Sequence, residues 1–207
     1  VGTEVAARLE LVQGLLDRAE RQIQLLNRLV GDLLDVSRIQ ANKLELRLET
    51  CDLANIVREA VEDQQQMAPA RLIRLELPAK EVHVIADPGS IGQVVTNYLS
   101  NALKYSVSDQ PIDVTLRVEE QTARLSVHDE GPGLSTSEQE RVWERFYRVP
   151  DIEVKSGSGV GLGLGLYISK TIVERHHGYV GVYSNPGKGA TFWFTMPLAS
   201  PTSIESE

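Results

Sequence analysis

Glycines at alternate positions are the first residues whose spacing suggests chemistry. Gly157, Gly159, Gly161, Gly163 and Gly165 lie between a polar segment and an apolar segment typical of a helix. Glycine has no Cβ, so its backbone can approach a ligand closely, and the first N–H groups of a helix attract phosphate. The pattern favours a phosphate-binding lid, and a flexible hinge is the simpler alternative.

The sequence around these glycines disfavours the two commonest nucleotide-binding motifs. A dinucleotide fingerprint requires a buried strand directly before its first glycine, whereas residues 151–156 are charged. The chain also has no glycine-lysine-serine or glycine-lysine-threonine sequence of the P-loop type. A nucleotide site would therefore have to use another fold.

The segment 129–133, Asp-Glu-Gly-Pro-Gly, follows an alternating strand pattern. The carboxylate of Asp129 could accept a hydrogen bond from the exocyclic amine of adenine, because charge-assisted hydrogen bonds are the stronger kind. Gly131 and Gly133 would let a flat ring approach the backbone. Considered alone, the segment is more typical of a tight turn.

A third candidate is a polar helix face. Asn97, Asn101 and Lys104 or Tyr105 are spaced so that they share one side of a helix. Magnesium takes oxygen ligands and keeps several waters, while lysine supplies a point charge for phosphate. The face suits Mg²⁺ and phosphate, although a solvated polar face is the alternative.

The elements that must position these residues fall into two regions. Residues 1–42 carry an unbroken heptad pattern, which predicts a partial dimerisation helix about 50 Å long that associates with a second copy. The apolar positions are Val5, Leu9, Val12, Leu16, Ala19, Ile23, Leu26, Val30 and Leu33.

Residues 43–199 mix strands and helices in an order that is not a regular βα alternation. The order predicts an α/β sandwich, with one mixed and mostly antiparallel sheet covered by helices. Helices are expected over residues 138–146 and 163–174. Residues 200–207 are expected to form a disordered tail.

Composition limits the partners. The chain has 207 residues, a net charge of −8 and one cysteine, Cys51. Negative charge disfavours nucleic acid, and a lone cysteine fits a reducing compartment. The sequence lacks an apolar run of the ~20 residues needed to span a membrane. We expect a cytoplasmic location without membrane contact by this segment, which could be the cytoplasmic part of a membrane sensor.

Together, segments 97–105, 129–133 and 161–166 resemble the N, G1 and G2 boxes of the histidine-kinase catalytic domain. That domain shares a superfamily with DNA gyrase, heat-shock chaperone ATPases and mismatch-repair ATPases. Residues 144–148 resemble the intervening F box, and residues 187–192 resemble the closing glycine motif. The five motifs occur in the family's order.

The resemblance covers residues 44–198, and residues 26–39 are similar to the second helix of the dimerisation and phosphoacceptor domain. It implies ATP and Mg²⁺ as cofactors. Asn101 would coordinate Mg²⁺ with support from Asn97, and Lys104 would contact phosphate.

The resemblance implies further roles for the adenine wall and the lid. Tyr105 would pack near adenine, Asp129 would bind its amino group, and Thr191 would lie under its pocket. Phe146 would anchor the lid. The glycines involved would be Gly131 and Gly133 at the adenine wall and Gly161, Gly163 and Gly165 in the lid, with Leu166 beginning the helix behind it. Candidate γ-phosphate contacts are Arg145, Arg148 and Lys155.

One departure limits the expected activity. The family transfers the γ-phosphate to a histidine on the first bundle helix, and then to an aspartate of a response regulator receiver domain. None of His83, His128, His176 and His177 lies in such a motif. This chain is therefore expected to bind ATP but to show little autophosphorylation by itself.

Three alternatives remain open. A related ATPase or serine kinase would typically carry glutamate where this chain has Asn97, because a carboxylate can act as a base and an amide cannot. A signalling module could dimerise and respond to nucleotide without kinase activity. A helical dimerisation protein with an α/β cap would leave the five ordered motifs unexplained.

Overall fold

The computed structural model describes residues 2–150, 152 and 161–200. The chain forms two compact units, Val1–Lys43 and Leu44–Glu207. Lys155, Gly157 and Gly159 lie outside the described residues, as does almost all of the predicted tail.

The first unit is a single helix, α1 (Gly2–Gln40), of 39 residues. It ends in a turn in which the Lys43 N–H donates to the Arg38 carbonyl at 2.8 Å. Asn42 has a φ of 52° in this turn, a left-handed conformation that asparagine tolerates at helix ends. The expected long helix is therefore present.

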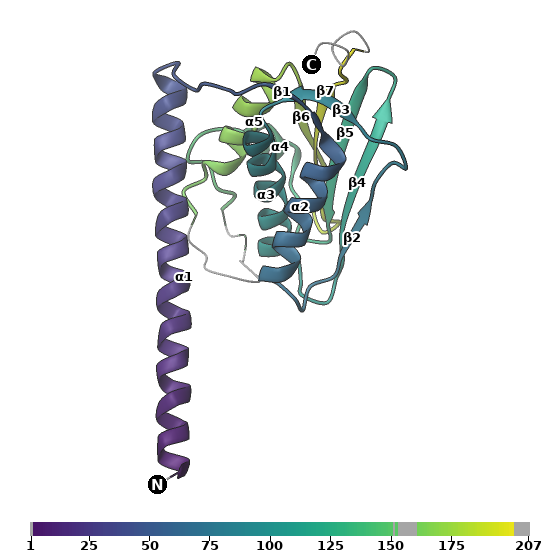
Figure 1. The fold of residues 1–207 in the computed structure, drawn as a ribbon. Coiled ribbons are helices and arrows are strands. Elements are labelled where there is room, and N and C mark those ends of the chain that lie inside the picture. Colours follow the sequence, from purple (N-terminus) through teal and green to yellow (C-terminus); the bar gives the residue numbers. More distant parts are fainter. Residues whose placement is uncertain (1, 151, 153–160, 201–207) are drawn as a thin grey trace. The chain divides into compact units, whose positions relative to one another are not determined.

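The second unit is built on a five-stranded sheet with the order β2-β4-β5-β7-β6 (Figure 1). Strand β2 runs parallel to β4, and the other neighbours are antiparallel. Two further strands, β1 and β3, form a separate antiparallel pair. The strands are β1 (Glu49–Asp52), β2 (Ile73–Glu76), β3 (His83–Ala86), β4 (Ile112–Glu119), β5 (Thr122–Asp129), β6 (Tyr179–Ser184) and β7 (Ala190–Pro197).

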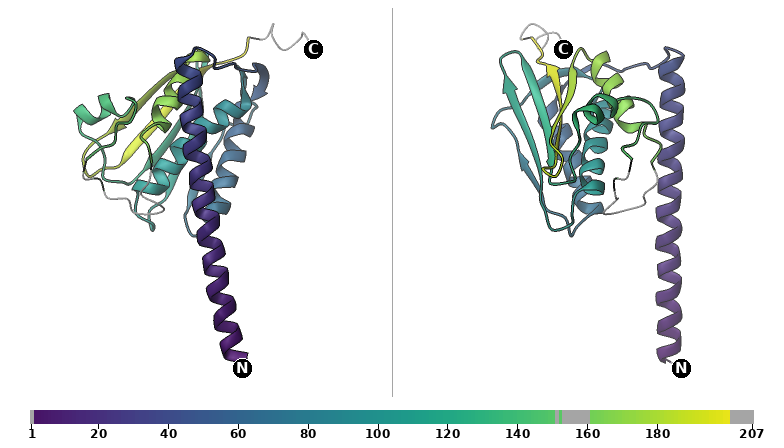
Figure 2. Two further views of the ribbon diagram at one scale, coloured as in Figure 1. Left: turned by 90° about the vertical axis from the view of Figure 1, so that its left-hand side faces the viewer. Right: turned by 180° about the vertical axis from the view of Figure 1, so that it is seen from behind.

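Three helices cover one face of this sheet, namely α2 (Leu53–Met67), α3 (Pro88–Tyr105) and α5 (Gly165–Arg175) (Figures 1 and 2). Strand residues alternate between the two faces, and the buried set in β5 is Ala123, Leu125, Val127 and Asp129. The core under α3 is aromatic, because the Tyr98 ring lies 5.8 Å from that of Phe192 and 6.1 Å from that of Phe194. The predicted α/β sandwich is confirmed.

Helix α3 begins at a strong N-cap. The Asp87 side chain accepts a hydrogen bond from the Ser90 N–H at 2.9 Å, and Pro88 occupies the first turn, where it removes no helical hydrogen bond. A buried histidine completes this end, since His176 Nε2 accepts from the Asp87 N–H at 3.0 Å.

Two expected helices are shorter than the sequence suggested. Helix α4 covers only Thr136–Arg141, and Phe146 has a φ of 62°, which no helix accommodates. Helix α5 begins at Gly165 rather than at Gly163, because Gly163 has a left-handed φ of 68°.

Candidate nucleotide-binding site

Asn97 joins the middle of α3 to the start of α5. It is only 5% exposed, and its Nδ2 donates to the Gly165 carbonyl at 3.4 Å and to Ser169 Oγ at 3.3 Å. A Cβ on Gly165 would lie 3.3 Å from Asn97 Oδ1. This close approach explains why glycine suits the first position of α5.

The next turns of α3 carry the other polar residues. Asn101 and Lys104 are both half-buried. Lys104 Nζ lies 5.0 Å from the centre of the Tyr105 ring, and a Cβ on Gly161 would lie 3.3 Å from that ammonium. The structure therefore brings this helix face close to Gly161, the first described glycine of the predicted lid.

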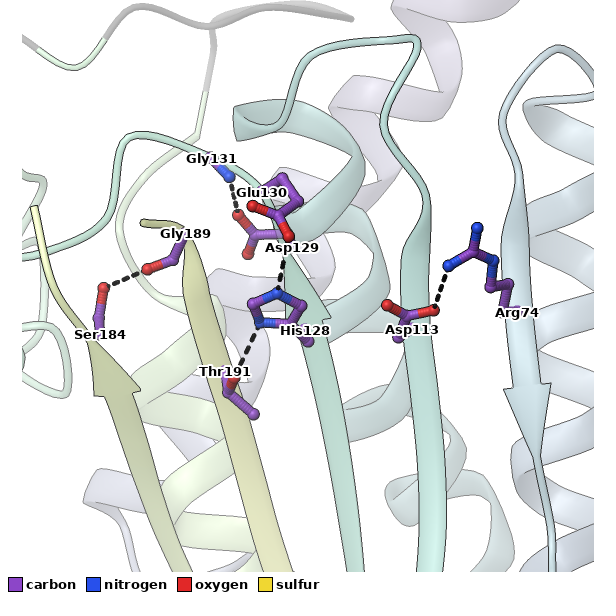
Figure 3. Close-up of polar contacts among 9 residues, drawn as sticks. All are labelled: Arg74, Asp113, His128, Asp129, Glu130, Gly131, Ser184, Gly189 and Thr191. Carbon is purple, nitrogen blue, oxygen red and sulfur yellow. Dashed lines mark hydrogen bonds and ion pairs between the residues drawn. The ribbon is translucent and has the colours of Figure 1, made fainter. Parts of the chain in front are cut away.

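Asp129 ends β5 and is 5% exposed. Its Oδ1 accepts a hydrogen bond from the Gly131 N–H at 2.8 Å (Figure 3). Burial raises the pKa of Asp129 to about 6, against the opposing effects of the Gly131 hydrogen bond and of His128. At neutral pH the group is therefore a charged, buried acceptor, suited to a ligand that donates a hydrogen bond.

The closing glycine motif supports the Asp129 turn through main-chain contacts. The Gly189 N–H donates to the Gly131 carbonyl at 3.1 Å, and the Gly187 N–H donates to the Pro132 carbonyl at 2.7 Å. A Cβ on Gly189 would lie 1.9 Å from the Asp129 carbonyl oxygen. Figure 3 shows Ser184 Oγ donating to the Gly189 carbonyl, at 2.6 Å. Glycine at position 189 is therefore required for the turn to close.

The expected place of Thr191 under the adenine pocket is wrong. Thr191 is paired with His128 across the strands, and its Oγ1 is hydrogen-bonded to His128 Nδ1 at 2.9 Å (Figure 3). Consecutive residues of a strand point to opposite faces, so Thr191 lies on the face opposite Asp129. Its neighbour Ala190 is buried and is paired with Asp129 instead.

The segment resembling the F box contacts the lid through its main chain. The Phe146 N–H donates to the Gly163 carbonyl at 3.0 Å, and a Cβ on Gly163 would lie 2.5 Å from the Tyr147 carbonyl oxygen. Phe146 as a whole is 60% exposed, and its contact with Gly163 is made by the main chain rather than by the ring.

The three candidate γ-phosphate residues, Arg145, Arg148 and Lys155, differ in what the structure shows of them. The Arg145 guanidinium lies 5.6 Å from the centre of the Tyr167 ring, in the first turn of α5. Leu166 lies in the same turn. Arg148 is exposed, and Lys155 falls outside the described residues. The structure thus places Arg145 against the first turn of α5.

Sequence reasoning missed Ser169 and Arg71, both of which are buried around the site. Ser169 Oγ accepts from Asn97, and Arg71 contacts the end of α3. Ser169 follows Gly165 by one helical turn, and that spacing could have indicated it. Arg71 has no local sequence signal.

Residues 86–200 match the family model described as "Histidine kinase-, DNA gyrase B-, and HSP90-like ATPase". The chain belongs to this family of ATPases. Two of its curated relatives are sensor kinases. Sensor histidine kinase RppB of Synechocystis sp. is 33% identical over 94% of this chain. Adaptive-response sensory kinase SasA of Trichormus variabilis is 32% identical over 91%. The chain spans 43% and 47% of these two relatives.

Solved structures give the same class. ShkA, described as full-length and in complex with AMPPNP, has a TM-score of 0.70 and 29% identity, covering 84% of this chain and 36% of ShkA. Mycobacterial sensor histidine kinase MprB has a TM-score of 0.63 and 27% identity, covering 73% of this chain and 97% of that structure. The sensor histidine kinase resemblance is thus confirmed.

Proposed function

We propose that this chain binds Mg-ATP and is the catalytic part of a sensor histidine kinase. The observation that carries the proposal is the convergence of two distant segments, the glycines 161–165 and the Asp129 turn, on α3. Lys104 Nζ lies beside Gly161, Asn97 beside Gly165, and the Tyr105 carbonyl oxygen would lie 3.3 Å from a Cβ on Gly131. One helix, α3, would then contact the phosphates, the lid and the adenine wall.

The donor set of α3 fits magnesium bound to phosphate. Asn101 offers a half-buried amide oxygen, a hard ligand that Mg²⁺ accepts while it keeps several waters. Bound Mg²⁺ would neutralise phosphate charge. Lys104 would hold a phosphate from the same helix, and the N–H groups at the start of α5 would favour another negative oxygen. These residues would position ATP, and positioning is the main requirement of phosphoryl transfer.

The phosphate acceptor would be a histidine outside this chain, followed by an aspartate of a response regulator. Within the chain, both ring nitrogens of His176 are used, because Nδ1 donates to the Ile172 carbonyl at 2.7 Å and Nε2 accepts from Asp87. His128 is hydrogen-bonded to Thr191.

Three expectations follow for the chain alone. We expect it to show little autophosphorylation, to form a homodimer through α1, and to have a cytoplasmic location. Among the described residues, no helix is long and apolar enough to cross a membrane.

A hydrolytic ATPase is the second candidate, and Asn97 argues against it. Asn97 occupies the position where those relatives typically carry a basic carboxylate, and an amide cannot take a proton from water. Its Nδ2 donates to Gly165 and Ser169. Asn97 therefore fits a role in joining α3 to the lid helix.

The test is calorimetric titration of a non-hydrolysable ATP analogue, with Mg²⁺ and with a chelator. We expect magnesium-enhanced binding that Asp129→Asn weakens at least tenfold, because the charged acceptor is lost. Asp113→Asn is the matched control, since Asp113 is a half-buried carboxylate paired with Arg74 at 3.6 Å (Figure 3). Equal binding by the wild type and Asp129→Asn would contradict the proposed site.

The transfer step needs a second assay. The chain with Mg-ATP is mixed with a supplied acceptor domain, and phosphohistidine is measured as an acid-labile, base-stable label. Label on the supplied domain and little on the chain itself would support kinase function. Binding without any transfer would favour the nucleotide-dependent signalling module.

A further inference from the structure

Arg71 is a buried cation that none of the roles above uses. It lies between α2 and β2 and is 7% exposed. Within the described part of the chain, no carboxylate forms an ion pair with its guanidinium. A charge that is buried without a counter-ion is costly unless hydrogen bonds satisfy it. Its partners should therefore show what the burial achieves.

Those partners lie at the C-terminal end of α3. Nη1 donates to the carbonyls of Leu103 at 3.3 Å and Ser106 at 3.4 Å. Nη2 donates to Ser106 Oγ at 2.6 Å and to the Gln110 carbonyl at 3.5 Å. The last carbonyls of a helix carry partial negative charge, which favours a cation there. Arg71 therefore closes the end of the helix that carries Lys104.

The same helix end touches the Asp129 turn. The Tyr105 carbonyl oxygen lies against Gly131, so that a Cβ there would be only 3.3 Å away. Gly131 in turn donates its N–H to Asp129 Oδ1. A guanidinium that fixes Ser106 and its neighbours thus also fixes the wall behind the Asp129 carboxylate.

Arg71 and Asp129 also affect each other's ionisation. Burial raises the pKa of Asp129, and Arg71 is among the groups that lower it again. Burial lowers the pKa of Arg71, and the attraction of Asp129 opposes that shift. Each buried charge favours the ionised form of the other.

We propose that Arg71 is a positioning residue for nucleotide binding. It holds the last turn of α3 against the Asp129 turn, and its buried positive charge favours the ionised Asp129 carboxylate that would accept a hydrogen bond from a ligand amine. The inference rests on the proposed ATP site. It deepens that site by naming a residue that would act without touching the nucleotide.

The test is the pH profile of analogue affinity between pH 5.5 and 8.5, measured by calorimetry on folded protein. Wild-type affinity is expected to fall as pH drops through the pKa of Asp129, about 6. In Arg71→Met the midpoint moves upward, because the positive charge that lowers this pKa is lost, while His128 and Glu130 keep their opposing effects on it. The loss of affinity at pH 7 is then partly recovered at pH 8.5.

Two variants distinguish this role from simple support. Arg71→Lys keeps the charge but loses the fork, so its midpoint stays near the wild-type value while its affinity falls. Arg74→Met removes an exposed arginine paired with Asp113, and it should change neither quantity. An unchanged midpoint in a folded Arg71→Met protein overturns the proposal.

Base selectivity gives an independent measurement. Inosine triphosphate has a carbonyl in place of the adenine amine, so wild type should prefer ATP and Arg71→Met should lose part of that preference. If Arg71→Met does not fold, Arg71→Lys decides: a reduced affinity with a wild-type midpoint supports the proposal, and an unchanged affinity or an upward shift of the midpoint overturns it. Failure of the proposed site itself is recognised separately, since wild type would then bind no analogue.

Discussion

The two units of the chain differ in how far their apolar side chains are buried. In α1 the stripe residues Leu26 and Val30 are 59% and 55% exposed. In the second unit Leu125 and Phe194 are fully buried. Burial of apolar surface is the main favourable contribution to folding. The second unit therefore has an apolar core of its own, whereas the exposed stripe of α1 is the surface through which we propose that the chain dimerises.

The largest effect should follow from a cavity in the second unit. Leu125→Ala removes a fully buried side chain paired with Leu116 and Phe194 across the strands, which should cost about 2–5 kcal/mol of unfolding free energy. Denaturant unfolding measures it. Val118→Ala in the neighbouring strand is the control, since Val118 is exposed. If the units are independent, neither variant changes self-association through α1.

A charge on the stripe should act only on association. Leu26→Glu places a carboxylate in the expected helix interface and should weaken dimerisation at least tenfold, about 1.4 kcal/mol. Sedimentation equilibrium measures the dissociation constant. Asn27→Glu introduces the same charge one position away and should change it little. A drop in the melting temperature of the second unit would show that α1 is not independent of it.

Replacing a glycine with alanine should change stability in opposite directions in the two units. A Cβ on Gly14 meets no atom within 4 Å, so Gly14→Ala should stabilise α1 by about 1 kcal/mol. Gly163→Ala should destabilise the lid segment, because Gly163 has a φ of 68° and a Cβ would lie 2.5 Å from the Tyr147 carbonyl. Circular dichroism reports the first change, and amide hydrogen exchange reports the second. Stabilisation by both variants would contradict the comparison.

The smallest effect is a pH dependence confined to the second unit, since residues 1–43 contain no histidine. Burial lowers the pKa of His176 below its usual 6.5. The unfolded chain then binds more protons, so this contribution is complete above about pH 6.5 and is lost as pH falls below it. His176→Gln keeps an acceptor for the Asp87 N–H but cannot titrate. The wild-type melting temperature should fall relative to His176→Gln between pH 7 and 5.5.

That comparison with His176→Gln is needed because Asp129 acts in the other direction. Its raised pKa means that the folded chain binds more protons than the unfolded chain between about pH 4 and 6. Stability therefore rises as Asp129 becomes protonated. Both proteins share this contribution, so it cancels in the difference. If the melting temperatures of the wild type and His176→Gln changed in parallel between pH 7 and 5.5, the role given to His176 would be contradicted.

Regular patterns made much of the fold predictable. The heptads indicated the long helix, and the irregular order of strands and helices indicated a mixed sheet under helices. The helix spacing of Asn97, Asn101 and Lys104 also placed these residues on one face. Such patterns are repeated over several residues, so a single exception does not hide them. Nucleotide binding by that face stays a prediction.

Features that depend on one residue or on distant contacts were not predictable. Thr191 was assigned to the wrong face because a shift of one residue in a strand reverses its side. The break at Phe146 depends on a single left-handed residue. Arg71 reaches Ser106 across 35 positions, and no local pattern indicates such a contact.

The buried carboxylate of Asp129 has a consequence for how long the protein survives. A buried charge lowers the stability of the nucleotide-free protein at neutral pH. A hydrogen-bond donor from a bound nucleotide would offset that loss of stability. Ligands that bind only the folded state stabilise it by an amount that grows with the logarithm of the ratio of free ligand to dissociation constant, and they reduce the open population that proteases attack. On the proposed function, cellular nucleotide supply would therefore influence the turnover of this protein as well as its signalling.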